Sequence, residues 1–426
     1  MDLAKIGLKR IAYGLLGLWL VLVMAVPGLA RTPELSPFAV EGEPAFDLGS
    51  AGASPNTAPE LNAADLEGWL DRFFAQQLDA DSAPGAVVAV VKGGNILLAK
   101  GYGYADVDQQ VPVDGQTTLF RVASLSKLFT TTAIMQLQEQ GRLSLDDDIR
   151  PYLGEQVQLD NPFPEPVTFA QLMTHTDGST KRRIGLAAAA EAQHQPLEDY
   201  LADHLPPIVY PPGKLFSYSS HAIALLGYLV QEISGQSFND YIDEHILQPL
   251  AMDRSSFAQP PPHRDALATG YRWVSGQFKP VPYLYLNIGP AASLASTATD
   301  MAHFMIAHLN GGEYQGSRIL SPEAIADMHT IHFRSHPALP GTGYGFRERR
   351  VNGRNVIGHL GSLRGYSSSL TLMGDRRLGL FIAANSFSGI HSQLLRQFFD
   401  RYFPAPPDAD VPVATLDPAD LDLNLV

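Results

Sequence analysis

Cysteine is absent from the 426-residue chain, which excludes a disulfide framework, a thiolate metal site and a lipid-modified cysteine. Lysine is scarce, and of the eight lysines only Lys127 has a serine three positions before it. Basic side chains are outnumbered by acidic ones, giving a net charge of −14. A chain this acidic repels nucleic acid and anionic lipid, so we expect neither as a partner.

The only long apolar run lies at the N-terminus. Three basic residues within the first ten precede an apolar run (residues 11–26), and small residues follow at Gly28 and Ala30. This layout predicts a signal peptide over residues 1–30 and a periplasmic or secreted bacterial protein with no stable membrane insertion after cleavage. Sixteen apolar residues are short for a membrane span, although an uncleaved segment would tether the protein to a membrane.

Two further segments have the composition of connecting or peripheral chain. Residues 31–60 are rich in Pro, Gly, Ala and Ser, which predicts a flexible linker. Residues 404–426 form an acidic, proline-rich tail. We therefore expect one folded domain over residues 61–403.

Strand-like runs lie at both ends of this domain, and helical patterns fill its middle. Two of the runs flank Gly93 and Gly94, the signature of a tight hairpin. The expected strands are 86–92, 95–103, 355–361, 366–373 and 378–385. The expected helices are 124–140, 168–175, 196–204, 220–234, 238–246, 299–310 and 391–403. The order predicts an α/β (α+β) fold, in which both chain ends build an antiparallel sheet flanked by helices. A largely helical subdomain, about 141–290, is inserted and leaves a cleft.

The segment 121–141 contains the sequence Ser124-Leu125-Ser126-Lys127. Positions i and i+3 share a helix face, so the Lys127 amine can reach the Ser124 hydroxyl. A buried lysine loses its charge readily and can then accept the serine proton. The alternative is a capping serine beside a solvated lysine.

Two other segments hold candidate functional residues. Tyr218 precedes a predicted helix after a Pro-Gly turn, and a tyrosine beside a lysine can transfer protons as a phenolate. His359 and nearby glycines lie at a strand edge, where a backbone N–H can stabilise an oxyanion. Taken singly, Tyr218 is compatible with an ordinary packing tyrosine, and His359 is compatible with a solvated histidine on a strand.

Together these segments resemble the serine β-lactamase/penicillin-binding-protein superfamily, in its class C β-lactamase-like branch of esterases and D-peptidases. The resemblance runs from about Pro84 to Phe403. It rests on "PGAVVAVVKGGNILLAKGYG", "TLFRVASLSKLFTTTAIMQLQEQGRLSLDDDI", "TFAQLMTHTDG", "YPPGKLFSYSS" and "GHLGSLRGYSS", in the family's order and spacing. It implies a β-lactamase/transpeptidase-like fold.

The resemblance implies a role for each matching position. Ser124 becomes acylated, while Lys127 and Tyr218 share the proton transfers. The oxyanion and substrate-binding set comprises the backbone N–H groups of Ser124 and Ser362, with Ser220, His359 and Gly361. No metal and no organic cofactor is implied.

Two departures from the family pattern bear on the substrate. Ser220 stands where asparagine is usual and offers no amide to a substrate carbonyl. His359 stands where lysine is usual and carries little charge near neutral pH. Both departures count against efficient β-lactam hydrolysis. Arg364 is either a replacement anion contact or a solvated loop arginine.

The expected function is an exported serine hydrolase of the carboxylesterase or D-amino-acid peptidase type. Its substrate is a small-molecule ester, an amide or a peptidoglycan-type peptide. A β-lactamase or penicillin-binding D,D-carboxypeptidase is the alternative within the family. A non-turnover covalent sensor or peptidoglycan-binding protein is the alternative from another class. An α/β-hydrolase esterase is disfavoured because the chain has no G-x-S-x-G motif.

Several further residues are compatible with ordinary structural roles. His175 is expected to have a hydrogen-bonding role in the structure, and His221 either lines the cleft or lies on a helix surface. The acidic run at 145–149 is expected to be a structural loop, because adjacent carboxylates do not converge on one ion. Four aromatic residues are candidates for lining the acyl pocket, although packing is their default role. They are Tyr271, Trp273, Tyr283 and Tyr285.

Overall fold

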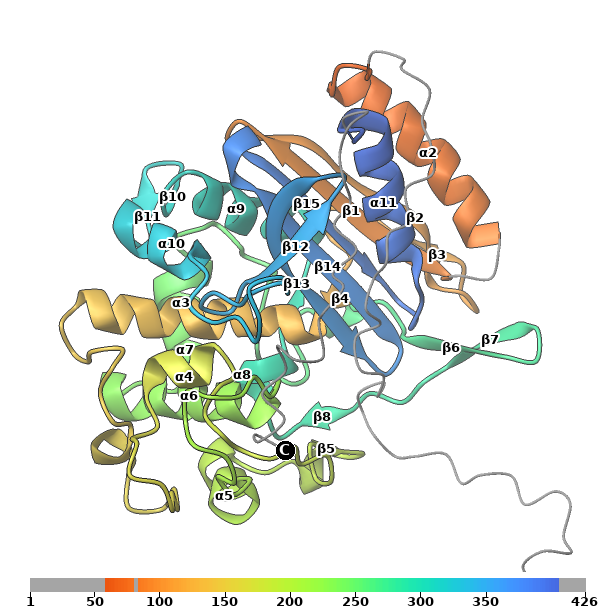
Figure 1. The fold of residues 1–426 in the computed structure, drawn as a ribbon. Coiled ribbons are helices and arrows are strands. Elements are labelled where there is room, and N and C mark those ends of the chain that lie inside the picture. The colour runs from red at the N-terminus through yellow and green to blue at the C-terminus, as the bar shows by residue number, and fades with distance from the viewer. Residues whose placement is uncertain (1–57, 80–82, 406–426) are drawn as a thin grey trace, which may run out of the picture. The chain divides into compact units, whose positions relative to one another are not determined.

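Seven antiparallel strands form one sheet that joins the two ends of the folded chain. The computed structural model describes residues 58–79 and 83–405, and in them the strand order is β12-β13-β14-β15-β1-β2-β3 (Figure 1). The strands are β1 (Gly85–Lys92), β2 (Asn95–Asp106), β3 (Val111–Pro112), β12 (Arg347–Val351), β13 (Arg354–Leu363), β14 (Tyr366–Met373) and β15 (Leu378–Ala384). The expected sheet, built from both chain ends, is confirmed.

Some sequence expectations concern other parts of the chain. The predicted signal peptide, residues 31–57 of the predicted linker and residues 406–426 of the predicted tail lie outside the described residues. In residues 58–79 and 83–405, no helix is both long and apolar enough to cross a membrane.

The two central strands are buried on both faces. Alternate residues of β1 point to opposite sides, so Val88 and Val90 join one apolar cluster while Val87 and Val91 join the other. Every residue of β15 is buried as well. Helices therefore cover both faces, which explains why these strands read as continuous apolar runs.

One face of the sheet is covered by a helix from each end of the described chain (Figure 1). These are α2 (Ala63–Asp79) and α11 (Ile390–Tyr402). Helix α11 was expected, whereas α2 was not. Its apolar residues Leu66, Leu70, Phe73 and Phe74 follow helical spacing and are buried against this face, so the signal was present in the sequence.

The other face packs against α9 (Ala298–Leu309), and beyond it lies α3 (Ser126–Glu139). Phe129 of α3 stacks on Phe304 of α9, with 4.1 Å between ring centroids. Every residue of α3 from Ser126 to Leu137 is buried. Helix α3 is therefore a central helix, and its polar groups between Ser126 and Leu137 are removed from water.

The remaining helices pack around α3 or at the edge of the fold. They are α4 (Phe169–Met173), α5 (Leu197–His204), α6 (Ser220–Ser234), α7 (Phe238–Ile242), α8 (Gly289–Ala292) and α10 (Pro322–His329). Helix α10 was not expected, and the helix expected over 238–246 changes at Ile242 to a π-helical turn, η4 (Asp243–Leu247). The 3₁₀ turns are η1 (Ala123–Leu125), η2 (Arg150–Tyr152), η3 (Glu191–Gln193), η5 (Arg264–Ala266) and η6 (Gly374–Arg376).

Four short two-stranded pairs complete the architecture. One of them, β6–β7, is a hairpin that extends away from the main sheet (Figure 1). The pairs are β4 (Phe120–Arg121) with β9 (Ala295–Ser296), β5 (Ala187–Ala188) with β8 (Tyr285–Leu286), β6 (Tyr271–Val274) with β7 (Gln277–Pro280), and β10 (Glu313–Tyr314) with β11 (Ser317–Arg318). The pair β4–β9 matters most for function, because β4 leads directly into the turn that holds Ser124.

Candidate active site

Ser124 lies in the 3₁₀ turn η1, between β4 and the buried helix α3. The residue before it, Ala123, has φ +51, a conformation that a residue with a Cβ rarely adopts. Two hydrogen bonds hold the turn: the Ser126 hydroxyl donates to the Ala123 carbonyl at 2.6 Å and accepts from the Leu294 N–H at 3.0 Å. Ser124 itself is 7% exposed. Its hydroxyl is thus fixed at the N-terminal end of α3.

Lys127 is fully buried one turn further along α3. Its Nζ lies 3.0 Å from the Ser124 hydroxyl and donates to the Ala291 carbonyl of α8 at 2.9 Å. Burial lowers the pKa of Lys127 to about 7, because the charged ammonium is disfavoured away from water. The neutral amine is therefore well populated at neutral pH. The alternative of a solvated lysine is wrong.

Tyr218 lies immediately before α6 and beside Lys127. The Lys127 Nζ lies 5.1 Å from the centre of the Tyr218 ring. Ser219, the next residue, caps α6 by accepting the Ala222 N–H at 3.1 Å. Tyr218 therefore occupies the fixed end of a helix that packs directly on α3.

His359 and Gly361 bring the sheet against the Ser124 turn. A Cβ on Gly361 would lie 2.3 Å from the Val122 carbonyl oxygen and 2.1 Å from the Ser368 hydroxyl. The Ser368 hydroxyl also donates to that carbonyl at 2.8 Å. Only glycine fits where β13 approaches the turn this closely.

His359 is buried, at 2% exposure, so the alternative of a solvated histidine is wrong. Its ring centre lies 5.9 Å from that of Tyr218. Its Nδ1 lies 2.6 Å from the Leu360 carbonyl oxygen, which makes Nδ1 the protonated nitrogen. Burial, followed by the Lys127 charge, holds the pKa of His359 well below its usual range. The position therefore supplies no positive charge.

The structure places the two remaining expected residues near this group without a direct bond to Ser124. Ser220 is the first residue of α6 and half-buried. Ser362 follows Gly361, and its buried hydroxyl has no hydrogen-bond partner among the described residues. Arg364 lies in the β13–β14 turn and is half-buried.

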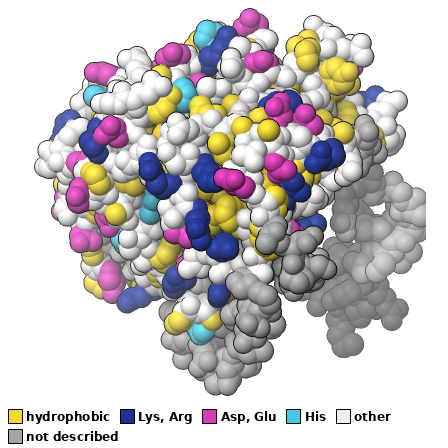
Figure 2. Space-filling view, turned by 90° about the horizontal axis from the view of Figure 1, so that it is seen from above, with side chains coloured by type: hydrophobic (Ala, Val, Ile, Leu, Met, Phe, Trp, Pro, Cys, Tyr) yellow, Lys and Arg dark blue, Asp and Glu magenta, His cyan; other side chains and the backbone are white. Residues whose placement is uncertain are grey.

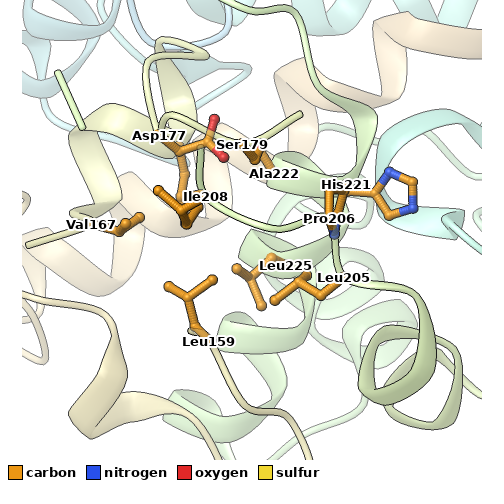
Figure 3. A pocket seen from close by; sticks show the side chains of 11 residues that line it. Leu159, Val167, Asp177, Ser179, Leu205, Pro206, Ile208, His221, Ala222 and Leu225 are labelled. Carbon is orange, nitrogen blue, oxygen red and sulfur yellow. The ribbon is translucent and has the colours of Figure 1, made fainter. Parts of the chain in front are cut away.

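His221 does not belong to this site. It is 3% exposed, so it is not on a helix surface, and its Nε2 lies 2.9 Å from the Tyr200 hydroxyl. It lines a separate small pocket, with its ring turned away from the aliphatic side chains (Figure 3). That pocket is lined by Leu159, Val167, Leu172, Asp177, Ser179, Leu205, Pro206, Ile208, His221, Ala222 and Leu225.

The acidic run at 145–149 forms a local hydrogen-bonded loop. Asp147 accepts from the Tyr152 hydroxyl at 2.5 Å and the Ser144 N–H at 2.8 Å, while Asp148 pairs with Arg150. In the part of the chain that the structure describes, no group of three or more His, Asp or Glu side chains is arranged to hold a metal ion. Acidic and basic side chains are interspersed on the face that Figure 2 shows.

A serine hydroxyl 3.0 Å from a fully buried lysine amine, at the end of a central helix, is an arrangement typical of serine hydrolases. The comparison with protein families agrees. The Beta-lactamase family model matches residues 70–401, and the chain belongs to this family. The expected superfamily and fold are thereby confirmed.

Individual relatives extend the comparison. Protein flp of Staphylococcus aureus (strain N315) is 29% identical over 334 residues, covering 75% of this chain and 63% of its own length. The chain thus spans less than two thirds of that relative. An uncharacterised protein of Mycobacterium tuberculosis, MT1414, is 32% identical over 279 residues, covering 59% of this chain and 69% of its own.

Solved structures share the fold. The octameric penicillin-binding protein homologue from Pyrococcus abyssi superposes with TM-score 0.68 at 28% identity, covering 80% of this chain and 78% of its own. EstCE1, a hydrolase with promiscuous acyltransferase activity, superposes with TM-score 0.67 at 22% identity, covering 80% and 99%. The second likeness concerns the fold alone.

The contact between β13 and the Ser124 turn predicts that Gly361→Ala inactivates the protein. The added methyl group displaces the Val122 carbonyl, and a shift of about 1 Å in a reacting group costs on the order of 100-fold in rate. Hydrolysis of p-nitrophenyl butyrate measures the loss. Gly389→Ala is the matched control, since no atom lies within 4 Å of the Cβ it adds. Equal activity of the two variants would contradict the assigned contact.

The lowered pKa of Lys127 predicts an ester hydrolysis rate that rises with pH through about 7. Only the neutral amine accepts the serine proton, so kcat/KM falls about tenfold per pH unit well below this pKa. Lys127→Arg, which stays charged, loses about 1,000-fold or more. A pH profile of kcat/KM from 5 to 9 tests this, and a limb that rises only near pH 10 would contradict it.

The same shift has a consequence for stability. Lys127 has its ordinary pKa of 10.5 in the unfolded chain and about 7 in the folded chain. Between these values the unfolded chain binds more protons, so the free energy of unfolding rises with pH across this window. Lys127→Met removes that part of the slope in denaturant titrations.

Proposed function

We propose that the protein is an exported hydrolase that forms an acyl-enzyme on Ser124, of the carboxylesterase or D-amino-acid peptidase type. The observation that carries the proposal is the 3.0 Å contact between the Ser124 hydroxyl and the buried Lys127 amine. A lysine with a pKa near 7 accepts a proton at physiological pH without a carboxylate partner.

In the proposed acylation step, neutral Lys127 takes the proton of the Ser124 hydroxyl as its oxygen bonds to the substrate carbonyl carbon. The carbonyl π electrons move to oxygen, giving a tetrahedral oxyanion. The oxyanion then reforms the carbonyl, and the bond to the alcohol or amine breaks. The leaving group takes a proton from Lys127, relayed through Tyr218, whose ring adjoins the amine.

Water completes the cycle by attacking the acyl carbon. Tyr218 and Lys127 accept the proton of the water, and the Ser124 oxygen leaves with that proton as the acid product is released. The N-terminal end of α3 and the turn that precedes it suit the negative charge of both tetrahedral states.

The Ser124 and Ser362 backbone N–H groups are the proposed oxyanion donors. The pairing register of β13 supports this role for the Ser362 N–H. Strand β12 pairs with β13 only up to Gly358, so β13 has an open edge from His359 onward. Leu363 and Tyr366 close a two-residue turn and form a hydrogen-bonded pair, so the neighbouring Ser362–Ser367 pair is not hydrogen-bonded. The Ser362 N–H therefore points to the open edge.

His359 and Ser220 support the preference for esters and D-amino-acid amides over β-lactams. His359 is buried and uncharged, so it offers a substrate carboxylate no ionic contact. Ser220 offers a short hydroxyl in place of an amide. A β-lactamase or D,D-carboxypeptidase is the second candidate within the family, and its support is the 28% identity to the Pyrococcus penicillin-binding protein homologue.

Intact-protein mass spectrometry, with product release followed in parallel, tests the proposal. We expect steady turnover of p-nitrophenyl butyrate, little or slow adduct with a penicillin, and loss of both in Ser124→Ala. A lasting penicillin adduct together with cleavage of a D-Ala-D-Ala peptide would favour the D,D-carboxypeptidase. An adduct without turnover would favour a covalent sensor. The absence of both adduct and turnover would favour a binding protein. Activity in Ser124→Ala would overturn the assignment.

Export forms a separate part of the proposal. We propose residues 1–30 as a signal peptide, 31–60 as a linker, 61–403 as the hydrolase domain with its helical subdomain at about 141–290, and 404–426 as a tail. The support is the order of features at the N-terminus, where basic residues are followed by an apolar run and then by small residues. In a secreting bacterial host we expect the mature protein to begin at Arg31. An intact N-terminus in the membrane fraction would instead show an uncleaved tether.

A further inference from the structure

His175 lies against Tyr218 and is held in an uncommon backbone conformation. It follows α4, its φ is +58, and it is 2% exposed. Its ring centre lies 4.6 Å from that of Tyr218. Non-glycine residues in this region of φ cost free energy, and they cluster at functional sites. The conformation therefore calls for a reason specific to this place.

Two hydrogen bonds give that reason. The Ser217 N–H donates to the His175 carbonyl at 2.8 Å, and the Ser219 N–H donates to the His175 Nδ1 at 3.3 Å. These donors are the residues immediately before and after Tyr218. One histidine, through its backbone and its ring, thus brackets the tyrosine from both sides.

We propose that His175 is a positioning residue that sets the place of the Tyr218 hydroxyl relative to Lys127 and Ser124. This inference rests on the proposed function, because Tyr218 must act in proton transfer for its position to matter. His175 itself does not take part in the bond changes. It acts through the backbone on either side of Tyr218.

The arrangement requires one particular form of the ring. A nitrogen that accepts an N–H carries no proton, so Nδ1 is bare and Nε2 bears the hydrogen. A doubly protonated ring could not accept from Ser219. Burial first, and then Lys127 on α3, His359 on β13, Arg347 on β12 and Lys181 in the loop after α4, hold the pKa of His175 well below its usual range.

This tautomer identifies a matched pair of variants. In His175→Asn the side-chain oxygen replaces Nδ1 as acceptor, and asparagine tolerates positive φ. In His175→Gln the amide lies at the place of Nε2, so the volume is kept and the acceptor for Ser219 is lost. The two changes are alike in polarity and differ in the proposed contact and in tolerance of positive φ, and thermal unfolding of both variants reports the second difference.

We expect His175→Gln to lower kcat for p-nitrophenyl butyrate at least tenfold, with KM changed less than about threefold, because a displaced proton-transfer group slows the chemical step. We expect His175→Asn to stay within about threefold of the parent. His221→Gln is the matched control: it is another buried histidine, three residues after Tyr218, bonded to Tyr200. Its kcat should not change.

A double-mutant cycle distinguishes positioning from general support of the fold. In a Tyr218→Phe background, His175→Gln should cost little more, because the hydroxyl it positions is gone. Thermal unfolding of each variant accompanies the kinetics. If both His175 variants keep activity, both lose it equally while folded, or the losses add in the cycle, the inference is wrong.

Two further measurements separate failure of the proposed function from failure of the inference about His175. If Ser124→Ala leaves turnover intact, the proposed function fails. If Tyr218→Phe leaves turnover intact while Ser124→Ala abolishes it, Tyr218 takes no part in proton transfer and the role of His175 is wrong. If His175→Gln does not fold, ¹⁵N NMR of histidine-labelled parent protein decides. A bare Nδ1 and a protonated Nε2 at pH 7 support the inference, and a proton on Nδ1 overturns it.

Discussion

The removal of the Lys127 amine from water is the constraint on which the rest of the structure depends. Helix α3 passes through the centre of the fold, so its residues from Ser126 to Leu137 are all buried. The amine keeps two oxygen partners there, the Ser124 hydroxyl and the Ala291 carbonyl, and neither carries a charge. A lysine in these surroundings loses its proton readily. The large apolar core is in this sense part of the chemistry.

Burial is the cause of the lowered pKa of Lys127, and no carboxylate among the described residues acts on it, although the chain as a whole is acidic. A carboxylate beside Lys127 would raise its pKa and prevent it from accepting the serine proton. Besides Lys127, two buried imidazoles adjoin Tyr218, those of His175 and His359, and burial holds the pKa of each well below its usual range. Uncharged hydrogen-bonding groups give the site polarity without fixing a proton on the base.

Sequence patterns predicted the parts of this arrangement that are local. Ser124 and Lys127 share a helix face, and Gly93 and Gly94 adopt positive φ between β1 and β2 as hairpin glycines do. Helices α2 and α10 went unpredicted although α2 has helical apolar spacing. Other residues have roles that the sequence left open, because those roles depend on tertiary contacts. Nothing near His221 in the sequence shows that its ring reaches Tyr200, and the need for glycine at position 361 arises from a carbonyl more than two hundred residues away.

Two residues with positive φ adjoin the proposed catalytic group: Ala123 precedes Ser124, and His175 lies against Tyr218. Each carries a conformational cost that only the surrounding fold can sustain, Ala123 through the Ser126 hydrogen bonds and His175 through Ser217 and Ser219. The sheet fixes the first through β13 and the helical part fixes the second through α4 and α6. The proposed reacting groups therefore lie between a turn packed against β13 and the capped start of α6.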